Sequence, residues 1–366
     1  MSFVIRPAQP DDNEAILSLL EGTPQQGAVT LNFERRPDYF RGARVTCEEP
    51  DVWVAEPRDT ASKGPIGAVY NVGWRRLWVN GEVRNIRYAH DLRIAVSCRN
   101  GTLLHRMFRK LRNQLAPGEW MQTTVLRDNQ ASMSTVASGR AGLPTYYPFG
   151  TIETSLIYTR ARRARLPEGW SIRRTGPYDR PAVARLLREE GSKKQFFPYW
   201  HLDRQQGDPF CFGMGSDQFL GLWEGEELRG LLGFWDQRDI KQTRVLAYRK
   251  GLRVLRHVYN THSRLRGGLR LPPPGGVLSY LTLHSIVVAD NEPRRLQALL
   301  DHAVECFHGR YDALVCGFFS QDPLARVAAG YRRQRLLSDH FLVSYEGDPR
   351  EQLDSTRLPY VDVARL

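Results

Sequence analysis

The stretch DLRIAVSCRNGTLLHRMFRKL, which runs from Asp91 to Leu111, decides the fold of this chain. Its aliphatic and β-branched beginning, Leu92 to Val96, predicts a strand, and five apolar residues then recur at helical spacing: Leu103, Leu104, Met107, Phe108 and Leu111. The link from Ser97 to Thr102 is polar and holds one glycine and no proline. Because the first amides of a helix are unpaired and lie at the positive end of its dipole, we expect a seat for a diphosphate here, with Arg99 at its rim. The alternative is an ordinary strand and helix of an α/β core.

This arrangement resembles the central motif of the GNAT superfamily of acyl-CoA-dependent N-acyltransferases, in which a strand leads through Q/R-x-x-G-x-G/A into a helix that holds the coenzyme A pyrophosphate. With Arg99 in the Q/R position, the two small positions fall on Thr102 and Leu104, so both glycines are missing. The resemblance implies a co-substrate, acetyl-CoA or another acyl-CoA, and no metal. It implies cofactor contacts from Ile94, Ala95, Val96, Arg99, Asn100, Gly101, Thr102, Leu103 and, further along the chain, Asn129.

A second family pattern, N-x-x-A-x-x-x-Y, follows the strand that we predict at residues 120–125. Asn129 fits this pattern, but Ser132 replaces the Ala, and Val136 stands where the family has the Tyr that protonates the departing thiolate. The resemblance therefore moves the general acid to the loop that follows, to Tyr146 or to its neighbour Tyr147.

Two candidates for the general base stand at the mouth of the predicted strand, His90 and Asp91. Acyl transfer to an amine requires that the ammonium lose a proton, and a histidine with an ordinary pKa near 6.5 can accept one at neutral pH. The structural alternatives are a paired sheet position for His90 and an ion pair of Asp91 with Arg93 or Arg87.

The elements around this motif follow the GNAT order. We predict a strand at residues 3–6, a helix with Asp11 or Asp12 as its N-cap, strands at residues 51–56 and 65–73, and a hairpin that turns at Asn80-Gly81. Residues 151–158 are expected to close the sheet as its last strand. The fold class is therefore α/β (α+β), with a mixed, mostly antiparallel sheet flanked by helices.

The opening of the chain recurs in its second half. WSIRRTGPYDRPAVARLL, residues 170–187, repeats the pattern of FVIRPAQPDDNEAILSLL, residues 3–20, which predicts two tandem GNAT-like domains. We place them at residues 1–159, which would bind coenzyme A, and 169–366, with a basic linker at residues 160–168. The loop from Ala289 to Arg294 holds two acids and a proline and no glycine, so the second domain is not expected to hold a diphosphate.

A basic insertion is predicted at residues 240–276 of the second domain. No Asp or Glu occurs from Ile240 to Ala289, whereas nine bases do: Lys241, Arg244, Arg249, Lys250, Arg253, Arg256, Arg264, Arg266 and Arg270. We expect a solvated basic face on an insertion that packs on the second domain. The alternative is an anionic ligand at residues 241–270, such as tRNA, a phosphorylated metabolite or a lipid headgroup. The bases are not interleaved with stacking aromatics, so nucleic acid is not favoured, although it stays open.

Composition sets the remaining limits. A length of 366 residues suggests two domains, and 41% hydrophobic residues are enough for packed cores. No apolar run is long enough for a membrane span, and the start of the chain lacks the apolar core of a signal peptide, so we expect a cytoplasmic protein. The five cysteines are scattered, which predicts reduced thiols and no zinc site. A net charge of +12 favours anionic partners without choosing among them.

Together these observations predict an acyl-CoA-dependent N-acyltransferase that transfers acetyl to a primary amine of a small molecule or a protein. Two alternatives remain. One is a non-catalytic protein of the same fold that senses coenzyme A or binds a partner, which the missing glycines and the missing Tyr favour. The other is an aminoacyl-tRNA-dependent transferase, which the basic segment favours and the Arg99 loop opposes.

Overall fold

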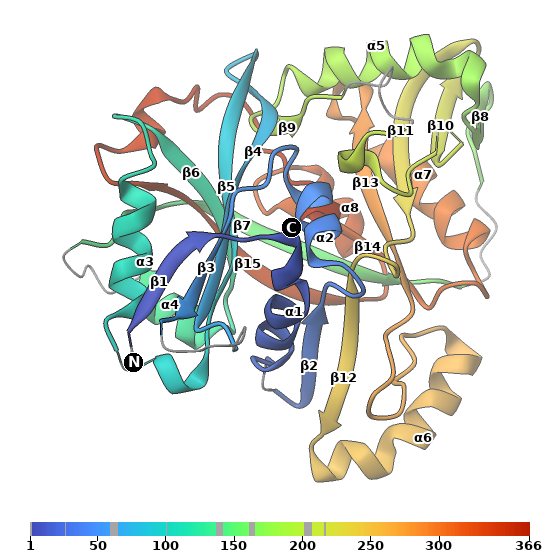
Figure 1. The fold of residues 1–366 in the computed structure, drawn as a ribbon. Coiled ribbons are helices and arrows are strands. Elements are labelled where there is room, and N and C mark those ends of the chain that lie inside the picture. The colour runs from blue at the N-terminus through green and yellow to red at the C-terminus, as the bar shows by residue number, and fades with distance from the viewer. Residues whose placement is uncertain are drawn as a thin grey trace.

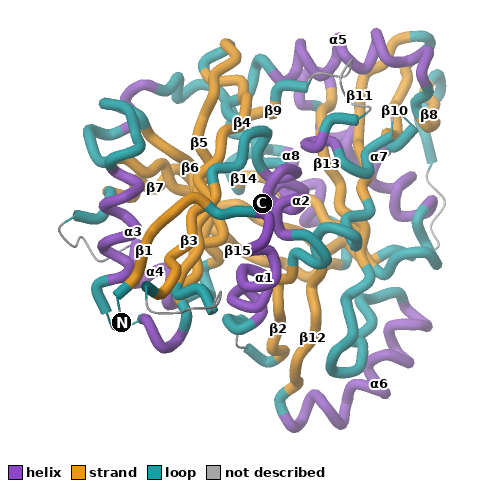
Figure 2. The backbone as a smooth tube through the Cα atoms, viewed as in Figure 1, coloured by secondary structure: helices purple, strands orange, loops and turns teal. Residues whose placement is uncertain are grey.

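The computed structural model of the chain describes residues 2–25, 27–58, 65–99, 101–136, 142–160, 165–200, 207–215 and 217–366, with the side chains of residues 131, 135, 136, 253, 265 and 266 left aside. Within these residues the fold is a mixed α/β structure, in which helices cover both faces of one large, mostly antiparallel sheet (Figures 1 and 2). The predicted fold class is confirmed.

The sheet consists of two similar halves. The first half contributes β1 (Phe3–Pro7), β3 (Val52–Pro57), β4 (Ala68–Val79), β5 (Glu82–Ile94), β6 (Trp120–Leu126) and β7 (Thr145–Tyr158). The second contributes β8 (Trp170–Arg174), β10 (Phe219–Glu224), β11 (Glu227–Trp235), β13 (Tyr280–Val288), β14 (Ala313–Phe319) and β15 (Arg333–Ser344). The strand order is β1-β3-β4-β5-β6-β15-β7-β14-β13-β11-β10-β8, and the short β9 (Phe197–Pro198) pairs with β4 off this path.

The two halves exchange their last strands. We expected residues 151–158 to close the sheet of the first half, but β7 begins at Thr145 and pairs with β14 of the second half, while β15 pairs with β6 of the first. The two exchanged strands also pair with each other from Arg333↔Ile157 to Ser344↔Thr145. β7 of the first half is therefore the antiparallel neighbour of β14, and β15 of the second half is the antiparallel neighbour of β6. The sheet is continuous across the molecule.

Helices cover the faces as the apolar periodicity predicts. On one face of the first half, α3 (Leu103–Arg112) buries Leu103, Met107, Phe108 and Leu111. The opposite face carries α1 (Asn13–Glu21) and α2 (Tyr39–Thr46), and α4 (Gln130–Val136) follows β6. In the second half, α7 (Pro293–Cys306) and α8 (Leu324–Ala329) share one core, and α5 (Arg180–Gly191) packs in another. The predicted Asn80-Gly81 hairpin is confirmed, since Val79 pairs with Glu82 and both turn residues have positive φ.

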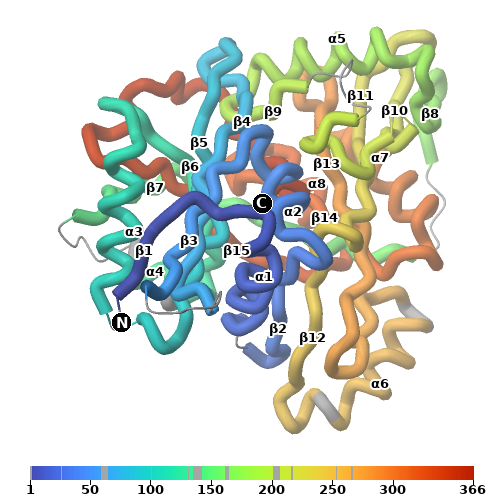
Figure 3. The backbone as a smooth tube through the Cα atoms, viewed as in Figure 1, coloured from blue at the N-terminus to red at the C-terminus, as the bar shows by residue number. Residues whose placement is uncertain are grey.

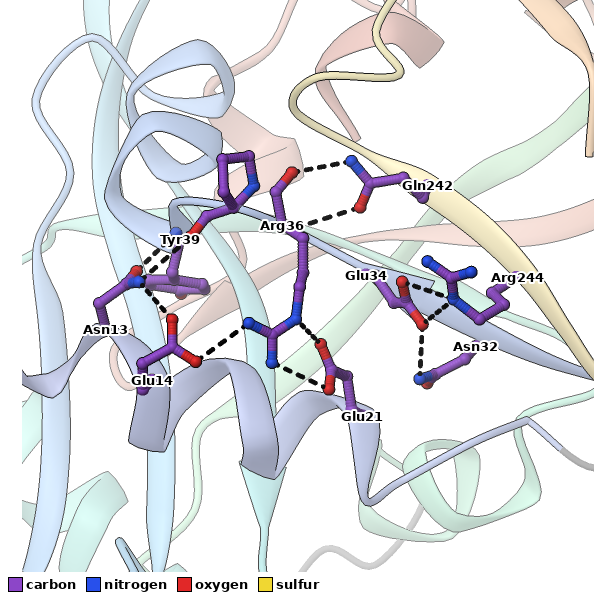
Figure 4. A network of polar contacts seen from close by, with 10 residues as sticks. Asn13, Glu14, Glu21, Asn32, Glu34, Arg36, Tyr39, Gln242 and Arg244 are labelled. Atoms are coloured by element: carbon purple, nitrogen blue, oxygen red, sulfur yellow. Dashed lines mark hydrogen bonds and ion pairs between the residues drawn. The ribbon is translucent and has the colours of Figure 1, made fainter. Parts of the chain in front are cut away.

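The basic segment divides into a strand, β12 (Gln242–Tyr248), and a helix, α6 (Lys250–Arg266). We expected it to pack on the second half, but β12 pairs with β2 (Val29–Glu34) of the first half in a separate two-stranded sheet. The side chains in Figure 4 explain why. Arg36 bonds Glu21 at 2.6 Å, Gln242 both accepts from and donates to the Arg36 backbone, and Arg244 bonds Glu34 at 2.8 Å. These contacts fix β12 to the N-terminal elements.

Candidate functional site

The sheet opens between β5 and β6. These parallel strands pair only at Arg87↔Met121 and Tyr88↔Gln122, although β5 continues to Ile94 and β6 to Leu126. At the start of the opening, Thr123 Oγ1 donates to the Ala89 carbonyl at 2.8 Å. Beyond that point the two strands diverge, and the space between them leads to the loop before α3.

The N-terminus of α3 carries no side-chain cap. The preceding loop turns through a short 3-10 helix, Val96–Cys98, in which the Cys98 amide donates to Ala95 at 2.8 Å, and the Gly101 amide donates back to Cys98 at 3.4 Å. Thr102, the N-cap residue, makes no capping hydrogen bond and is exposed, as is Arg99. The first turn of α3 therefore presents backbone donors at the positive end of the helix dipole, next to a cation. Asn100 lies outside the described residues.

The corresponding helix of the second half is closed by its own residues. The Glu292 side chain caps α7 by accepting from the Arg294 amide at 3.2 Å, and Asp290 bonds Arg229 and Arg295. A carboxylate thus occupies the position where an anion would bind. This is the loop that the sequence predicts not to hold a diphosphate.

The opening between β13 and β14 is also filled. These strands pair only from Tyr280↔Ala313 to Thr282↔Val315, so they diverge as β5 and β6 do. The residues from Tyr360 to Leu366 enter this opening, at the centre of the molecule (Figure 3), and their short 3-10 helix, Val363–Arg365, packs against both strands. We call this segment, residues 360–366, the tail. The Ile286 amide donates to the Tyr360 hydroxyl at 3.0 Å, which satisfies a donor at the edge of the opening.

A bulge in β5 positions the candidate base. Val69 pairs with Arg93 and Asn71 with His90, so Asp91 and Leu92 lie opposite a single residue of β4, and Asp91 has φ +53°. The bulge brings His90 Nδ1 within 3.0 Å of Asp91 Oδ2. The structure therefore brings the two predicted residues together, and it pairs Asp91 with Arg35, at 3.6 Å, instead of Arg93 or Arg87.

Electrostatics at this pair favour a charged imidazole. Burial alone would lower the pKa of His90, but the neighbouring Asp91 carboxylate outweighs burial, and the pKa is raised above 6.5. Burial alone would raise the pKa of Asp91, but Arg35 and His90 outweigh it and hold that pKa well below its usual range. The two side chains therefore stabilise each other's charged forms.

Two residues that sequence reasoning missed complete this cluster, Arg35 and Cys47. The Cys47 thiol is fully buried, and its Sγ lies 3.9 Å from His90 Nε2. Burial would raise the pKa of Cys47, but its contact with His90 and the charge of Arg75 outweigh burial and lower it. Arg35 lies between β2 and α2. Nothing in the sequence around Cys47 indicates its neighbour, because α2 and β5 meet only in the folded chain.

His90 stacks on Tyr88, and Tyr88 lines a small, partly open cavity. Its volume is about 30 Å³, enough for a water molecule. Polar groups from β4, β6, β15 and the tail line it: Arg75, Gln122, Thr124, His340, Asp362 and Arg365. Among the described protein atoms, five polar atoms of these residues lack a hydrogen-bond partner: Gln122 Nε2, Thr124 Oγ1, His340 Nδ1, Asp362 Oδ2 and Arg365 Nε. Donors, an acceptor and an imidazole nitrogen thus line one small space, which is an arrangement suited to a small polar molecule.

The remaining predicted residues lie elsewhere. Tyr146, on β7, packs edge-on against Phe341 in the core beneath α3, on the sheet face opposite His90, and burial raises its pKa to about 12. Asn129 accepts from the Ser132 amide at 3.2 Å, so its side chain caps the start of α4. The structure does not bring either residue into contact with His90.

Comparison of the whole chain with solved structures gives consistent matches. A GCN5-related N-acetyltransferase from Sphaerobacter thermophilus superposes with a TM-score of 0.57 at 14% identity, covering 94% of this chain and 96% of that one. Saccharomyces cerevisiae N-myristoyltransferase with bound myristoyl-CoA superposes with a TM-score of 0.59 at 12% identity, covering 95% and 84%. A glucosamine N-acetyltransferase region of a fungal β-N-acetylglucosaminidase gives 0.59 at 14% identity, and this chain spans 38% of that protein.

No protein-family model matches the chain, and no curated protein matches it in sequence. The structural matches, at these identities, establish the architecture, and they extend over nearly all of the chain, including both halves of the sheet. The chain has the fold of the GCN5-related N-acetyltransferases.

Proposed function

We propose that this protein is an acyl-CoA-dependent N-acyltransferase and that acyl-CoA binds in the opening between β5 and β6. The observation that carries this proposal is the difference between the two halves. The first opening leads to an uncapped helix N-terminus beside Arg99, whereas Glu292 caps the corresponding helix of the second half and the tail fills its opening. Residues 94–103 would hold the pantetheine and the diphosphate.

The filled opening indicates where the thioester would bind. β13 has a bulge like that of β5, because Leu231 pairs with Val287 and Gly233 with His284, and there the Ile286 amide donates to the hydroxyl oxygen of Tyr360. The equivalent residue at the first bulge is Leu92, and among the described residues no side chain takes the place of Tyr360 there. We propose that the Leu92 amide donates to the thioester carbonyl oxygen and stabilises the negative charge that develops on it during attack.

His90 is our candidate base, and Asp91 orients it. The neutral imidazole would take a proton from the acceptor ammonium, the free amine would attack the carbonyl carbon, and the C–S bond would break with protonation of the thiolate. Tyr146 remains the proposed proton donor to that thiolate, acting from the α3 face of the opening while His90 acts from the other face. Asn129 is retained as a proposed contact to the thiol end.

The family resemblance favours acetyl as the acyl group and a primary amine as the acceptor. The cavity itself, at about 30 Å³, has room for a water molecule and for neither of these groups, so it would supply polar atoms at the edge of the acceptor site. The unpaired Asp362 oxygen could accept from an ammonium, and the unpaired Gln122 amide could donate to an oxygen of the same acceptor. The proposed acceptor is therefore a primary amine of a small molecule or of a protein end.

The tandem division belongs to the same proposal, with residues 1–159 as the acyl-CoA-binding domain, 160–168 as a linker and 169–366 as the supporting domain. The equivalent openings and bulges support it, and the exchange of β7 and β15 means that the last strand of each half completes the sheet of the other.

Titration calorimetry with acetyl-CoA tests the proposal. We expect micromolar binding by the wild-type chain, a loss of at least about tenfold in Arg99→Glu through reversal of one phosphate-facing charge, and no change in Arg188→Glu. Arg188 is an exposed arginine of α5, so the control makes the same change in net charge. Binding followed by turnover across a panel of primary amines supports the transferase. Binding without turnover would indicate the non-catalytic alternative, and salt-sensitive tRNA binding without acetyl-CoA binding would indicate the tRNA-dependent one.

A further inference from the structure

Helix α6 projects from the body of the molecule, below the sheet in Figure 1 and beside β12. Its inward side is held by the chain that returns from it. Asn260 donates to the Leu271 carbonyl at 2.9 Å and accepts from the Leu271 amide at 2.8 Å, and Ser263 is buried. These contacts fix which side of the helix faces outward.

The outward side carries an apolar row that nothing in the described chain covers. Val254 is 77% exposed, Val258 70% and Leu255 58%, and Val254 and Val258 are the two most exposed large aliphatic side chains described. Their spacing of i, i+1 and i+4 places them on one face of the helix. Leaving such side chains in water forgoes the free energy that burial of their apolar surface would release. A row of three on one projecting helix therefore indicates a partner surface.

The same helix concentrates positive charge. Lys250 and Arg264 are both exposed and lie at i and i+14, so their two charges follow one line along the helix beside the apolar row. On either side of α6, two arginines are paired with carboxylates: Arg244 pairs with Glu34, and Arg270 pairs with Asp312. No carboxylate of the described residues pairs with Lys250 or Arg264, and none occurs in the sequence from Ile240 to Ala289.

We propose that α6 docks in the plane of an anionic membrane surface, with Val254, Leu255 and Val258 inserted at the headgroup boundary and with Lys250 and Arg264 against lipid phosphates. An apolar row beside a basic stripe is the composition of a helix that lies in a membrane interface. Charge complementarity supplies the attraction to anionic lipid, and the apolar row selects a lipid surface over RNA, since RNA would use the bases and leave the row in water. This docking does not depend on the proposed catalytic function.

Docking at a surface is distinct from crossing the bilayer. Among the described residues, no helix combines the length and the apolar character that a membrane span requires. The Leu271–Gly276 return, with its three successive prolines, leaves α6 little freedom to pack its apolar row back on the body. The row is therefore available to a flat external surface.

Vesicle co-sedimentation with the full-length chain tests the proposal. Wild-type protein should sediment with phosphatidylcholine vesicles that contain about a third phosphatidylserine and should stay in solution with phosphatidylcholine alone. The double variant Val254→Ser/Val258→Ser should lose at least about tenfold in vesicle affinity, and Lys250→Gln/Arg264→Gln should lose a similar factor together with most of the salt dependence. All four positions are exposed, so the fold should persist, which circular dichroism checks.

The matched control is Tyr178→Ser/Val83→Ser, which removes two exposed apolar side chains elsewhere and should leave vesicle affinity unchanged. Equal loss in this control, or no sedimentation with anionic vesicles, would overturn the proposal. So would salt-sensitive binding to tRNA that the valine substitutions leave intact while vesicle binding is absent. Acetyl-CoA calorimetry on the same variants should be unchanged, so failure of membrane docking and failure of the transferase proposal are told apart.

Discussion

His90 and His284 occupy equivalent positions in the two halves of the sheet. Each is followed by a residue with positive φ at a bulge, 53° at Asp91 and 48° at Ser285, and in each case Nδ1 lies 3.0 Å from the side-chain oxygen of that residue. The backbone arrangement is duplicated, but the chemistry is not. Burial, with Arg365 nearby, lowers the pKa of His284 to about 3, whereas the Asp91 carboxylate raises that of His90. Of these two bulges, only the first holds a histidine whose pKa is raised.

Replacing the two histidines should therefore have different effects. His90→Gln retains hydrogen bonding but cannot take up a proton, so we expect kcat to fall by roughly 10²–10⁴. His284→Gln should lower the melting temperature, because the ring packs tightly against Gly233 and Trp235, and should leave the pH dependence of kcat/KM unchanged. Steady-state kinetics and thermal melts of both variants check this. A pH profile that shifts in His284→Gln but not in His90→Gln would reverse the assignment.

Asp91→Asn should move the acid limb of the pH–rate profile. Asn tolerates positive φ as Asp does, so the bulge should persist. Without the carboxylate the pKa of His90 falls, so the neutral base forms at lower pH, and the rise of kcat/KM should shift to lower pH by more than the error of the profile. An unshifted limb would show that another group controls it.

The same variant makes a stability prediction with a defined sign. The pKa of His90 is raised in the folded state. Its contribution to the unfolding free energy is therefore fully present below about pH 6.5 and is lost as the pH rises through the raised pKa. The folded pKa of Asp91 is lowered, so its share is present above about 4 and is lost as pH falls further. We therefore compare the unfolding free energies of the wild type and Asp91→Asn. The difference in favour of the wild type should be of order 3–5 kcal/mol, as for a broken buried pair, and should be largest near pH 5–6. Urea titrations across pH measure it.

Local sequence patterns predicted most of the helices and strands. Helical spacing predicted α3, Asn80-Gly81 predicted the hairpin, and the repeat at residues 170–187 predicted that the second half resembles the first in its elements. Each depends on residues that are close in sequence. The exchange of β7 and β15 has no such signal, because the neighbours of these strands, β14 for β7 and β6 for β15, lie far away in sequence. The pairing of β12 with β2 could not be predicted either, because the two strands are far apart in sequence.

The candidate site was predicted in part. His90 and Asp91 are adjacent in sequence, so their contact could be anticipated, and the Arg99 loop could be identified from its place between a strand and a helix. Cys47 and Asp362 could not be found, because they reach the site from α2 and from the tail, which are far away in sequence. Tyr146 was chosen for its residue type, and strand alternation places it on the opposite sheet face.

Gln122→Leu should separate stability from function at the cavity. The Gln122 amide nitrogen is buried without a partner, and leaving such a donor unpaired costs about 1–3 kcal/mol. Leucine has a similar volume and no donor, so the unfolding free energy should stay the same or rise, while KM for the amine should increase. Chemical denaturation and amine kinetics check the two effects. A clear loss of stability would mean that a structural water already satisfies the amide and that the cavity is not an acceptor site.

Gly317→Ala should displace the tail from the opening between β13 and β14. A Cβ at Gly317 would lie 2.2 Å from Val363 Cγ1, so either β14 or the tail must move, at a cost of roughly 1–3 kcal/mol. Because the tail also contributes Asp362 and Arg365 to the cavity, we expect KM for the amine to rise while acetyl-CoA affinity stays constant.

The matched control is Gly251→Ala on α6, where an added Cβ meets open space and should stabilise the helix by up to about 1 kcal/mol. Denaturation, calorimetry and limited proteolysis of the tail measure these effects. An unchanged tail and unchanged amine kinetics, with stability lost, would mean that β14 yields instead and that the tail does not shape the acceptor site.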